Sequence, residues 1–174
     1  MNQPSSSPLL KTTLVWKLDD DISTDVIYPG RYMATVLPTE TPQYAFADLP
    51  DLNKKLASGE FPPGSALVAG KNFGCGSSRE QAASTLKGYE LAVIARGFAR
   101  IFLQNAINLG LRTIVCPTIE ANVGDKLEIY ADRVVNVTSG KSFVVVPLPK
   151  SRQVIIDAGG LIAYTRQRVT AAHS

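Results

Sequence analysis

The chain has 174 residues, of which 45% are hydrophobic and 19% are charged, and its formal net charge at pH 7 is +3. This composition supports one domain with a sizeable core and excludes a chain that is disordered throughout. The small, evenly spread charge gives no basis for a nucleic-acid partner, and no apolar run approaches the ~18 residues of a membrane span.

The first third of the sequence predicts a tail, one strand and a long loop. Residues 1–11 are polar and lack the basic region of a secretory signal, so we expect a disordered tail and a cytoplasmic protein. Residues 12–18 are β-branched and apolar, which predicts a strand. Proline and glycine then recur at Pro29, Gly30, Pro38 and Pro42. They predict a loop before a partly helical stretch at 43–58, and we expect residues 29–42 of this loop to be mobile in the chain alone.

The middle of the chain alternates between short buried strands and helices. Strands are expected at 65–70, 90–95 and 112–117, and helices at 79–88 and 98–110. Gly88 and Gly110 are the expected C-caps of these two helices. The β-α-β-α-β order predicts parallel strands with right-handed crossovers.

The last third has a different texture. Residues 125–147 are short alternating segments with a turn at 138–141, which predicts antiparallel strands. A helix should follow and stop at the Gly159–Gly160 pair, before an apolar segment and a C-terminal tail at 167–174. The pattern predicts an α/β fold with a parallel sheet and an antiparallel sheet beside it.

The glycine-rich stretch GKNFGCGSSRE, residues 70–80, is the candidate binding motif. Ser77 and Glu80 have the spacing of a capping box, which predicts Ser77 as the N-cap of the next helix. Arg79 carries a fork-shaped guanidinium suited to a carboxylate or phosphate. The stretch lacks the Gly-Lys-Ser/Thr of a P-loop, and no core histidine could serve as base to a serine. A simple cap and an anion site both fit the local pattern; the position after a parallel strand favours the anion site.

The same stretch, followed by AVIARGFARIFLQNAINLGL, resembles the small subunits of 3-isopropylmalate dehydratase in the aconitase superfamily. DISTDVIYPGRYM and AGGLIAY resemble the N-terminal and C-terminal motifs of that family, so the resemblance covers residues 12–165. It implies a three-layer β/β/α swivelling domain at residues 12–166. It also implies a hydro-lyase, active only with a large subunit in a heterodimer or heterotetramer.

The resemblance also places the cofactor outside this chain. A 4Fe–4S cluster on the large subunit would act as a Lewis acid on a small-molecule substrate. We expect no cofactor or metal to be bound by this chain itself, because two cysteines and one histidine are too few for such a site.

Residue roles follow from the same resemblance. Ser77 matches the catalytic serine, which takes the carbon-bound proton as an alkoxide, and Asp25 matches an active-site aspartate of the superfamily. Ser78 and Arg79 match groups that bind the substrate, Arg79 through a carboxylate. Arg31 lies in the stretch that carries another substrate arginine in related enzymes.

Tyr32, Met33 and Ala34 lie in the segment that meets the distinguishing group of the substrate. Homoaconitase-type chains tend to carry an arginine there; with Ala34 in its place, a branched apolar group is favoured over a charged one. Gln81 departs from the histidine usual in the family. The alternatives are a related hydro-lyase subunit, for homoaconitate or 2,3-dimethylmalate, and a non-catalytic swivel domain that serves as a binding module.

Overall fold

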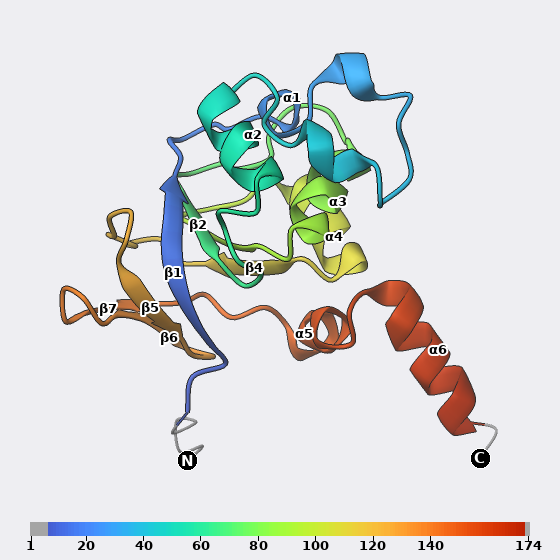
Figure 1. The fold of residues 1–174 in the computed structure, drawn as a ribbon. Coiled ribbons are helices and arrows are strands. Elements are labelled where there is room, and N and C mark those ends of the chain that lie inside the picture. The colour runs from blue at the N-terminus through green and yellow to red at the C-terminus, as the bar shows by residue number, and fades with distance from the viewer. Residues whose placement is uncertain (1–6, 173–174) are drawn as a thin grey trace.

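The structure, a computed structural model, describes residues 7–172 (Figure 1). Most of the predicted tail, residues 1–6, lies outside this range, as does His173. The first strand begins at Leu10, two residues before its predicted start. Within the described residues the strands are β1 (Leu10–Lys17), β2 (Ala66–Ala69), β3 (Ala92–Ala95), β4 (Arg112–Val115), β5 (Lys126–Ile129), β6 (Arg133–Asn136) and β7 (Lys141–Val144).

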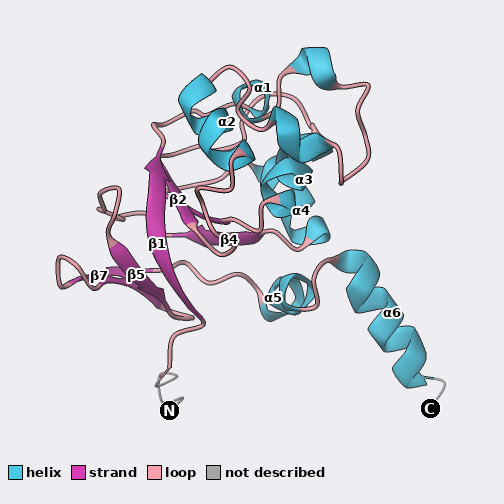
Figure 2. Ribbon diagram, viewed as in Figure 1, coloured by secondary structure: helices cyan, strands magenta, loops and turns pink. Residues whose placement is uncertain are grey.

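In Figure 2 the helices lie above and to one side of the strands, and the last helix projects away from them. They are α1 (Thr24–Ile27), α2 (Pro50–Ala57), α3 (Glu80–Gly88), α4 (Arg100–Leu109), α5 (Lys150–Asp157) and α6 (Leu161–Ala172). Two short 3₁₀ turns, η1 (Gly30–Tyr32) and η2 (Thr41–Tyr44), break the long loop between α1 and α2.

The strands are arranged in the order β4-β3-β2-β1-β5-β6-β7. Strands β1 to β4 are parallel, and β5, β6 and β7 pair antiparallel. Strand β1 belongs to both parts: residues 10–13 pair antiparallel with β5, and residues 14–17 pair parallel with β2. The predicted parallel and antiparallel sheets are confirmed, and a single strand joins them.

Two buried clusters separate three layers. One lies between the parallel strands and the helices and includes Leu67, Val93 and Phe102. The other lies between the parallel and the antiparallel strands and includes Ile94 and Phe143. Consecutive residues of β2 and β3 point to opposite faces, so each strand feeds both clusters and is apolar throughout. The β/β/α expectation is therefore confirmed.

The two predicted C-caps differ in outcome. Gly110 caps α4 with a left-handed backbone (φ 74°), as predicted. The prediction for Gly88 is wrong, because Gly88 is the last residue of α3 and Tyr89 caps it with φ −88°. A side chain at Gly88 would place its Cβ 2.4 Å from Cγ of Pro42, so this glycine is explained by close packing.

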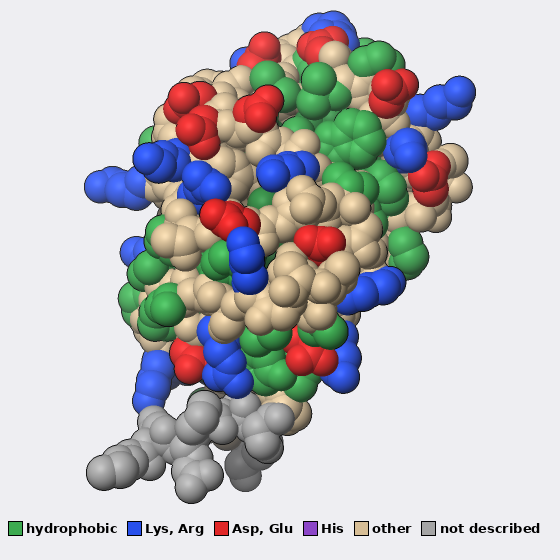
Figure 3. Space-filling view, turned by 90° about the vertical axis from the view of Figure 1, so that its left-hand side faces the viewer, with side chains coloured by type: hydrophobic (Ala, Val, Ile, Leu, Met, Phe, Trp, Pro, Cys, Tyr) green, Lys and Arg blue, Asp and Glu red, His purple; other side chains and the backbone are tan. Residues whose placement is uncertain are grey.

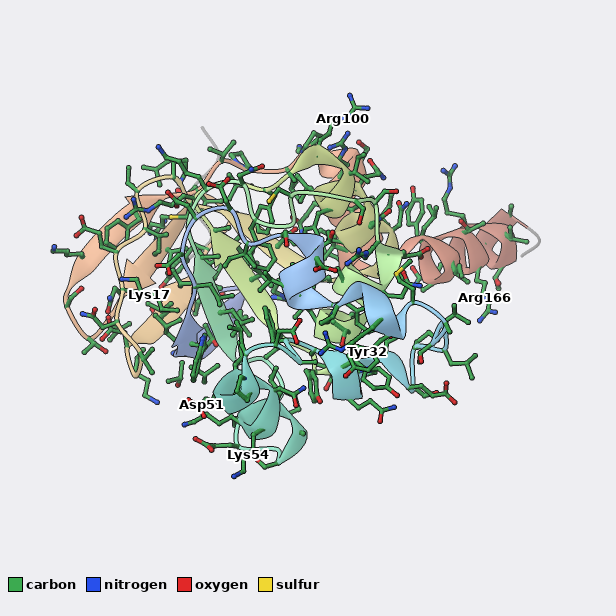
Figure 4. All side chains as sticks on the ribbon, turned by 90° about the horizontal axis from the view of Figure 1, so that it is seen from above. Lys17, Tyr32, Asp51, Lys54, Arg100 and Arg166 are labelled. Atoms are coloured by element: carbon green, nitrogen blue, oxygen red, sulfur yellow. The ribbon has the colours of Figure 1, made fainter. Side chains whose placement is uncertain are left out.

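The C-terminal segment forms a projecting helix. Helix α6 continues to Ala172 and so includes residues 167–172, where a tail was expected. It extends away from the body of the domain, and Arg166 on it lies far from the rest in the view from above (Figures 1 and 4). Each helix within residues 7–172 is too short or too polar to cross a lipid bilayer.

Charges of both signs are mixed on the molecular surface. Figure 3 shows lysine and arginine side chains interspersed with aspartate and glutamate over the face that carries β1 and α2. Such mixing produces no extended positive field on this face.

Candidate active site

The site is built from three loops that follow β1, β2 and β3 at their carboxyl ends, at the top of Figure 1. The loops span residues 18–30, 70–79 and 96–99. Backbone hydrogen bonds of 2.7 and 2.8 Å join the first loop to the second, and bonds of 2.9 and 3.0 Å join the second to the third. The carboxyl ends of parallel strands are where open α/β sheets bind ligands, so the position agrees with a binding site.

Gly74 anchors the second loop against α4. Its φ is +82°, and a Cβ there would lie 2.2 Å from Cγ of Phe102. Phe73 and Phe98 pack on Phe102, with ring centroids 5.2 and 6.2 Å away. The glycine therefore lets the loop lie directly on an aromatic cluster, which gives the following residues a rigid base.

Asp25 and Arg79 form an ion pair between the first and second loops. The Asp25 carboxylate also accepts a 2.9 Å hydrogen bond from the backbone N–H of Gly30, and Arg79 donates to the carbonyl of Tyr28 at 3.2 Å. The hydrogen bond from Arg79, followed by that from Gly30, lowers the pKa of Asp25 below its ordinary value of 3.8. The carboxylate is therefore ionised at neutral pH and fixed beside the arginine.

Ser77 and Ser78 are exposed on the second loop. The prediction that Ser77 caps the next helix is wrong: α3 begins at Glu80, its N-cap residue is Arg79, and no side chain caps it. A tight turn, in which the Arg79 N–H donates to the Ser77 carbonyl at 2.9 Å, moves the helix start two residues onward. The serine hydroxyl is thus not engaged as a cap.

Thr24 supports this serine from the first loop. Its side chain is buried, with 2% of its surface exposed, and its hydroxyl donates to the Ser77 carbonyl at 2.9 Å. The Thr24 and Ser77 hydroxyl oxygens are 3.5 Å apart. Thr24 therefore positions Ser77 through the backbone and lies within hydrogen-bond reach of its hydroxyl.

Arg31 points to a second carboxylate. Both of its terminal nitrogens donate to Asp48, at 2.6 and 3.0 Å, and its Cζ lies 4.6 Å from the ring centroid of Tyr32. The Tyr32 ring stacks on Tyr44 at 4.1 Å, and buried Tyr28 meets both rings edge-on. The start of the specificity segment is thus packed, and Figure 4 shows Tyr32 from above.

The rest of that segment faces solvent. Met33 is 41% exposed, and Ala34 is exposed beside it. Gln81, in place of the family's histidine, is half-buried in the first turn of α3. The structure pairs Asp25 with Arg79 and joins Ser77 to Thr24, the neighbour of Asp25 in the chain, whereas Met33 and Ala34 are exposed.

Three residues of this site have roles that the sequence did not indicate. Thr24 lies within the DISTDVIYPGRYM motif, but its contact with Ser77 depends on a loop 53 positions away in the chain. Gly30 lacks a Cβ that would lie 3.1 Å from Arg79. Asp48 is separated by 17 positions from Arg31, and no local pattern marks it.

Residues 7–172 contain no group of three or more His, Cys, Asp or Glu side chains that could hold a metal ion. Cys116 is buried in the core, and burial raises the pKa of its thiol to about 11. Cys75 lies beside the carbonyl of Asp21 in the first loop. The donor set of the described chain therefore does not fit an iron–sulfur cluster.

Comparison with known proteins agrees with this arrangement. Residues 26–118 match the aconitase C-terminal domain. The chain is 43% identical to the 3-isopropylmalate dehydratase small subunit of Methanosarcina acetivorans, over 89% of this chain and 96% of that protein. It is 42% identical to the isopropylmalate/citramalate isomerase small subunit of Methanocaldococcus jannaschii, over 89% and 93%.

A solved structure shows the same fold. The crystal structure of 3-isopropylmalate dehydratase from Methanocaldococcus jannaschii superposes with a TM-score of 0.84 at 38% identity. The match covers 94% of this chain and 97% of that one. The chain therefore belongs to the aconitase C-terminal domain family and, within it, to the small subunits of 3-isopropylmalate dehydratase.

Proposed function

We propose that this chain supplies the proton-transfer group and the carboxylate-binding groups of a dehydratase that interconverts 2-isopropylmalate and 3-isopropylmalate. The observation that carries the proposal is the Asp25–Arg79 pair beside Ser77, on loops joined at the carboxyl ends of the parallel strands. The relatives are named small subunits, so a large subunit would complete the site. On sequence grounds alone, the cytoplasm remains the expected compartment.

Ser77 is the proposed base. Its oxygen would remove the proton from the substrate carbon next to the hydroxyl-bearing carbon, and the hydroxyl would leave as hydroxide to give an alkene. Return of the proton to the carbon that lost the hydroxyl, with hydroxide adding where the proton was lost, yields the isomer without net gain or loss of atoms. The 4Fe–4S cluster, carried by the large subunit in the proposed complex, would supply Lewis-acid chemistry at the departing hydroxyl.

A serine hydroxyl is a weak base in water, so its surroundings decide whether it can act. The fixed guanidinium of Arg79 and the start of α3 both favour negative charge near this loop. The Thr24 hydroxyl donates to the Ser77 carbonyl and so holds the backbone that carries the Ser77 oxygen. Both serines are exposed in the chain alone, so the proposed large subunit would also exclude water from them.

Substrate binding divides between two groups of residues. Arg79 and Arg31 would bind the two carboxylates, and Ser78 would donate a further hydrogen bond. Tyr32, Met33 and Ala34 would contact the isopropyl group. Met33 and Ala34 are uncharged, and burying an unpaired carboxylate against them would be costly, which favours an apolar substituent.

A methylated malate is the second candidate substrate. The Methanocaldococcus jannaschii relative is named for both isopropylmalate and citramalate, and it is 42% identical to this chain. Citramalate carries a methyl group in place of a larger alkyl group, and an open, uncharged loop can accept either.

The test is reconstitution with the cognate cluster-bearing large subunit under anaerobic conditions. Alkene formation is followed by ultraviolet absorbance with isopropylmalate, citramalate, 2,3-dimethylmalate, homocitrate and citrate. Ser77→Ala should lower kcat by about 10²–10⁴ fold, while exposed Ser142→Ala on β7 should behave as the wild type. No turnover of any substrate by an intact complex would support the non-catalytic module instead.

A further inference from the structure

Arg31 has its carboxylate-binding fork filled by its own chain. Both terminal nitrogens donate to Asp48, one to each carboxylate oxygen, at 3.0 and 2.6 Å. This is the two-bond geometry in which an arginine binds a substrate carboxylate. Arg31 cannot make that contact with a substrate while Asp48 occupies the fork.

The pair lies on the surface and can open. The side chains of Arg31 and Asp48 are 51% and 53% exposed, so water can solvate both charges when they separate. The Tyr32 ring would keep the guanidinium near the site, because the cation lies over its face and the ring is stacked on Tyr44. Opening the pair therefore releases the fork without releasing the loop.

The loop that follows has few buried side chains of its own. Met33, Val36 and Leu37 are 41%, 66% and 52% exposed. The Arg31–Asp48 pair thus ties the base of a solvent-facing loop to the segment that precedes α2. If a substrate carboxylate replaced Asp48 on Arg31, this loop would no longer be tied to the segment before α2. The same loop is proposed to contact the alkyl group of the substrate.

We propose that Asp48 is a positioning residue that holds the Arg31 fork in the substrate-free chain and is displaced by a substrate carboxylate. The proposal rests on the proposed function, in which Arg31 binds one of the two carboxylates. Asp48 then competes with the substrate, and the apparent affinity is reduced by the fraction of chains in which the pair is closed.

The electrostatic surroundings agree with this exchange. The hydrogen bond from Arg31 lowers the pKa of Asp48, so it is ionised at neutral pH. Arg31 follows Gly30, whose backbone N–H donates to Asp25 at 2.9 Å, so one short segment joins this pair to the Asp25–Arg79 pair. Under the proposed function, one carboxylate of the substrate would bind Arg79 and the other would bind Arg31.

The test compares steady-state kinetics of reconstituted wild-type and Asp48→Asn enzymes. Asparagine keeps the shape but removes the charge that competes for Arg31, so KM should fall about two- to five-fold with kcat little changed. Asp48→Glu keeps the charge and should stay near the wild type. Asp51→Asn, an exposed carboxylate on α2 without an ion pair in the described structure, controls for the lost charge (Figure 4).

A double-mutant cycle separates displacement from a general charge effect. In an Arg31→Ala background, Asp48→Asn should leave KM unchanged, because there is no fork to release. An equal fall in KM in both backgrounds, an equal fall in Asp51→Asn, or a rise in KM in Asp48→Asn would overturn the proposal. The rise would mean that Asp48 holds Arg31 in its working position.

Hydrogen exchange of the chain alone tests the tether without any turnover. Asp48→Asn should speed exchange of the backbone amides of residues 32–35 relative to wild type and Asp51→Asn; unchanged exchange would overturn the tether. If none of the three holoenzymes (wild type, Asp51→Asn and Asp48→Asn) turns over any substrate, the proposed function is contradicted. Displacement of Asp48 by substrate is then contradicted as well. An active wild type with no effect of Asp48→Asn overturns this inference alone.

Discussion

The carboxylate of Asp25 and the guanidinium of Arg79 are joined across two loops whose residues lie 54 positions apart in the chain. The pair forms because β1 and β2 are parallel neighbours, so the loops after them meet at one edge of the sheet. An arginine held in this way does not have to be ordered when a substrate binds. Prior ordering of the binding groups reduces the entropy cost of reaching the reactive geometry.

Gly30→Ala should disturb this pair directly. The new Cβ would lie 3.1 Å from a terminal nitrogen of Arg79 and 3.4 Å from Asp25, so the guanidinium must shift by a few tenths of an ångström. We expect kcat/KM of the reconstituted enzyme to fall about ten-fold. Gly97→Ala is the matched control, because its Cβ would lie 3.8 Å from its nearest neighbour. Equal effects of the two substitutions would contradict the role of Gly30.

Thr24→Val should act on the proton-transfer group. Valine keeps the shape but removes the hydroxyl that donates to the Ser77 carbonyl, which should cost about 1–2 kcal/mol of stability. Because Ser77 loses its support, kcat should fall about ten-fold or more while KM changes little. Thr24→Ser restores the hydroxyl and should recover most of the rate. A loss of stability with unchanged kcat would limit Thr24 to a structural role.

The pKa of Asp25 should depend on Arg79. Because the folded pKa is lower than the ordinary value of 3.8, the pair stabilises the fold above that pH, and its contribution is lost as pH falls below it. In Arg79→Gln, an NMR titration of the carboxyl should show the Asp25 pKa moving up toward 3.8. Asp125 is the internal control, since Asn122 and Asn136 lower its pKa without an arginine. An Asp25 pKa that does not move would contradict the ion pair.

Gly74→Ala should destabilise the fold more than its backbone angle alone requires. Its Cβ would overlap Phe102, so strain and overpacking together should cost about 2–4 kcal/mol in chemical denaturation. Gly140→Ala has a similar φ of +74° with open space around it, and it should cost about 1–2 kcal/mol. The difference between the two variants measures the contact with Phe102, and a difference near zero would contradict that contact.

Periodic and punctuated segments were predictable from the sequence. The apolar runs of β2 and β3 and the terminal glycine of α4 carry local signals, and the parallel order follows from their alternation with helices. The prediction of a capping box at Ser77 was wrong because the start of α3 depends on the backbone conformation at Arg79, which the spacing of residue types does not determine. The prediction of Gly88 as a C-cap was wrong because this glycine is needed for close packing against Pro42, which lies in a different element.

Pairings between distant segments were the least predictable part of the site. The motif residues Asp25, Ser77 and Arg79 were identified by resemblance, and their roles stay predictions. The contacts between distant segments were not identified. The contact between Arg31 and Asp48, for example, arises only when η1 and the segment before α2 pack together. No run of residue types around position 48 indicates that contact.

Strand β1 has a consequence for how the molecule comes apart. Its first half is hydrogen-bonded to the antiparallel strands and its second half to the parallel strands, so detaching it opens both ladders at once. The two sheets should therefore lose protection against amide exchange together, as one cooperative unit, although the two buried clusters lie on opposite faces of the parallel strands. The loops that carry Asp25 and Ser77 begin where β1 and β2 end, so the site should persist until this unit opens.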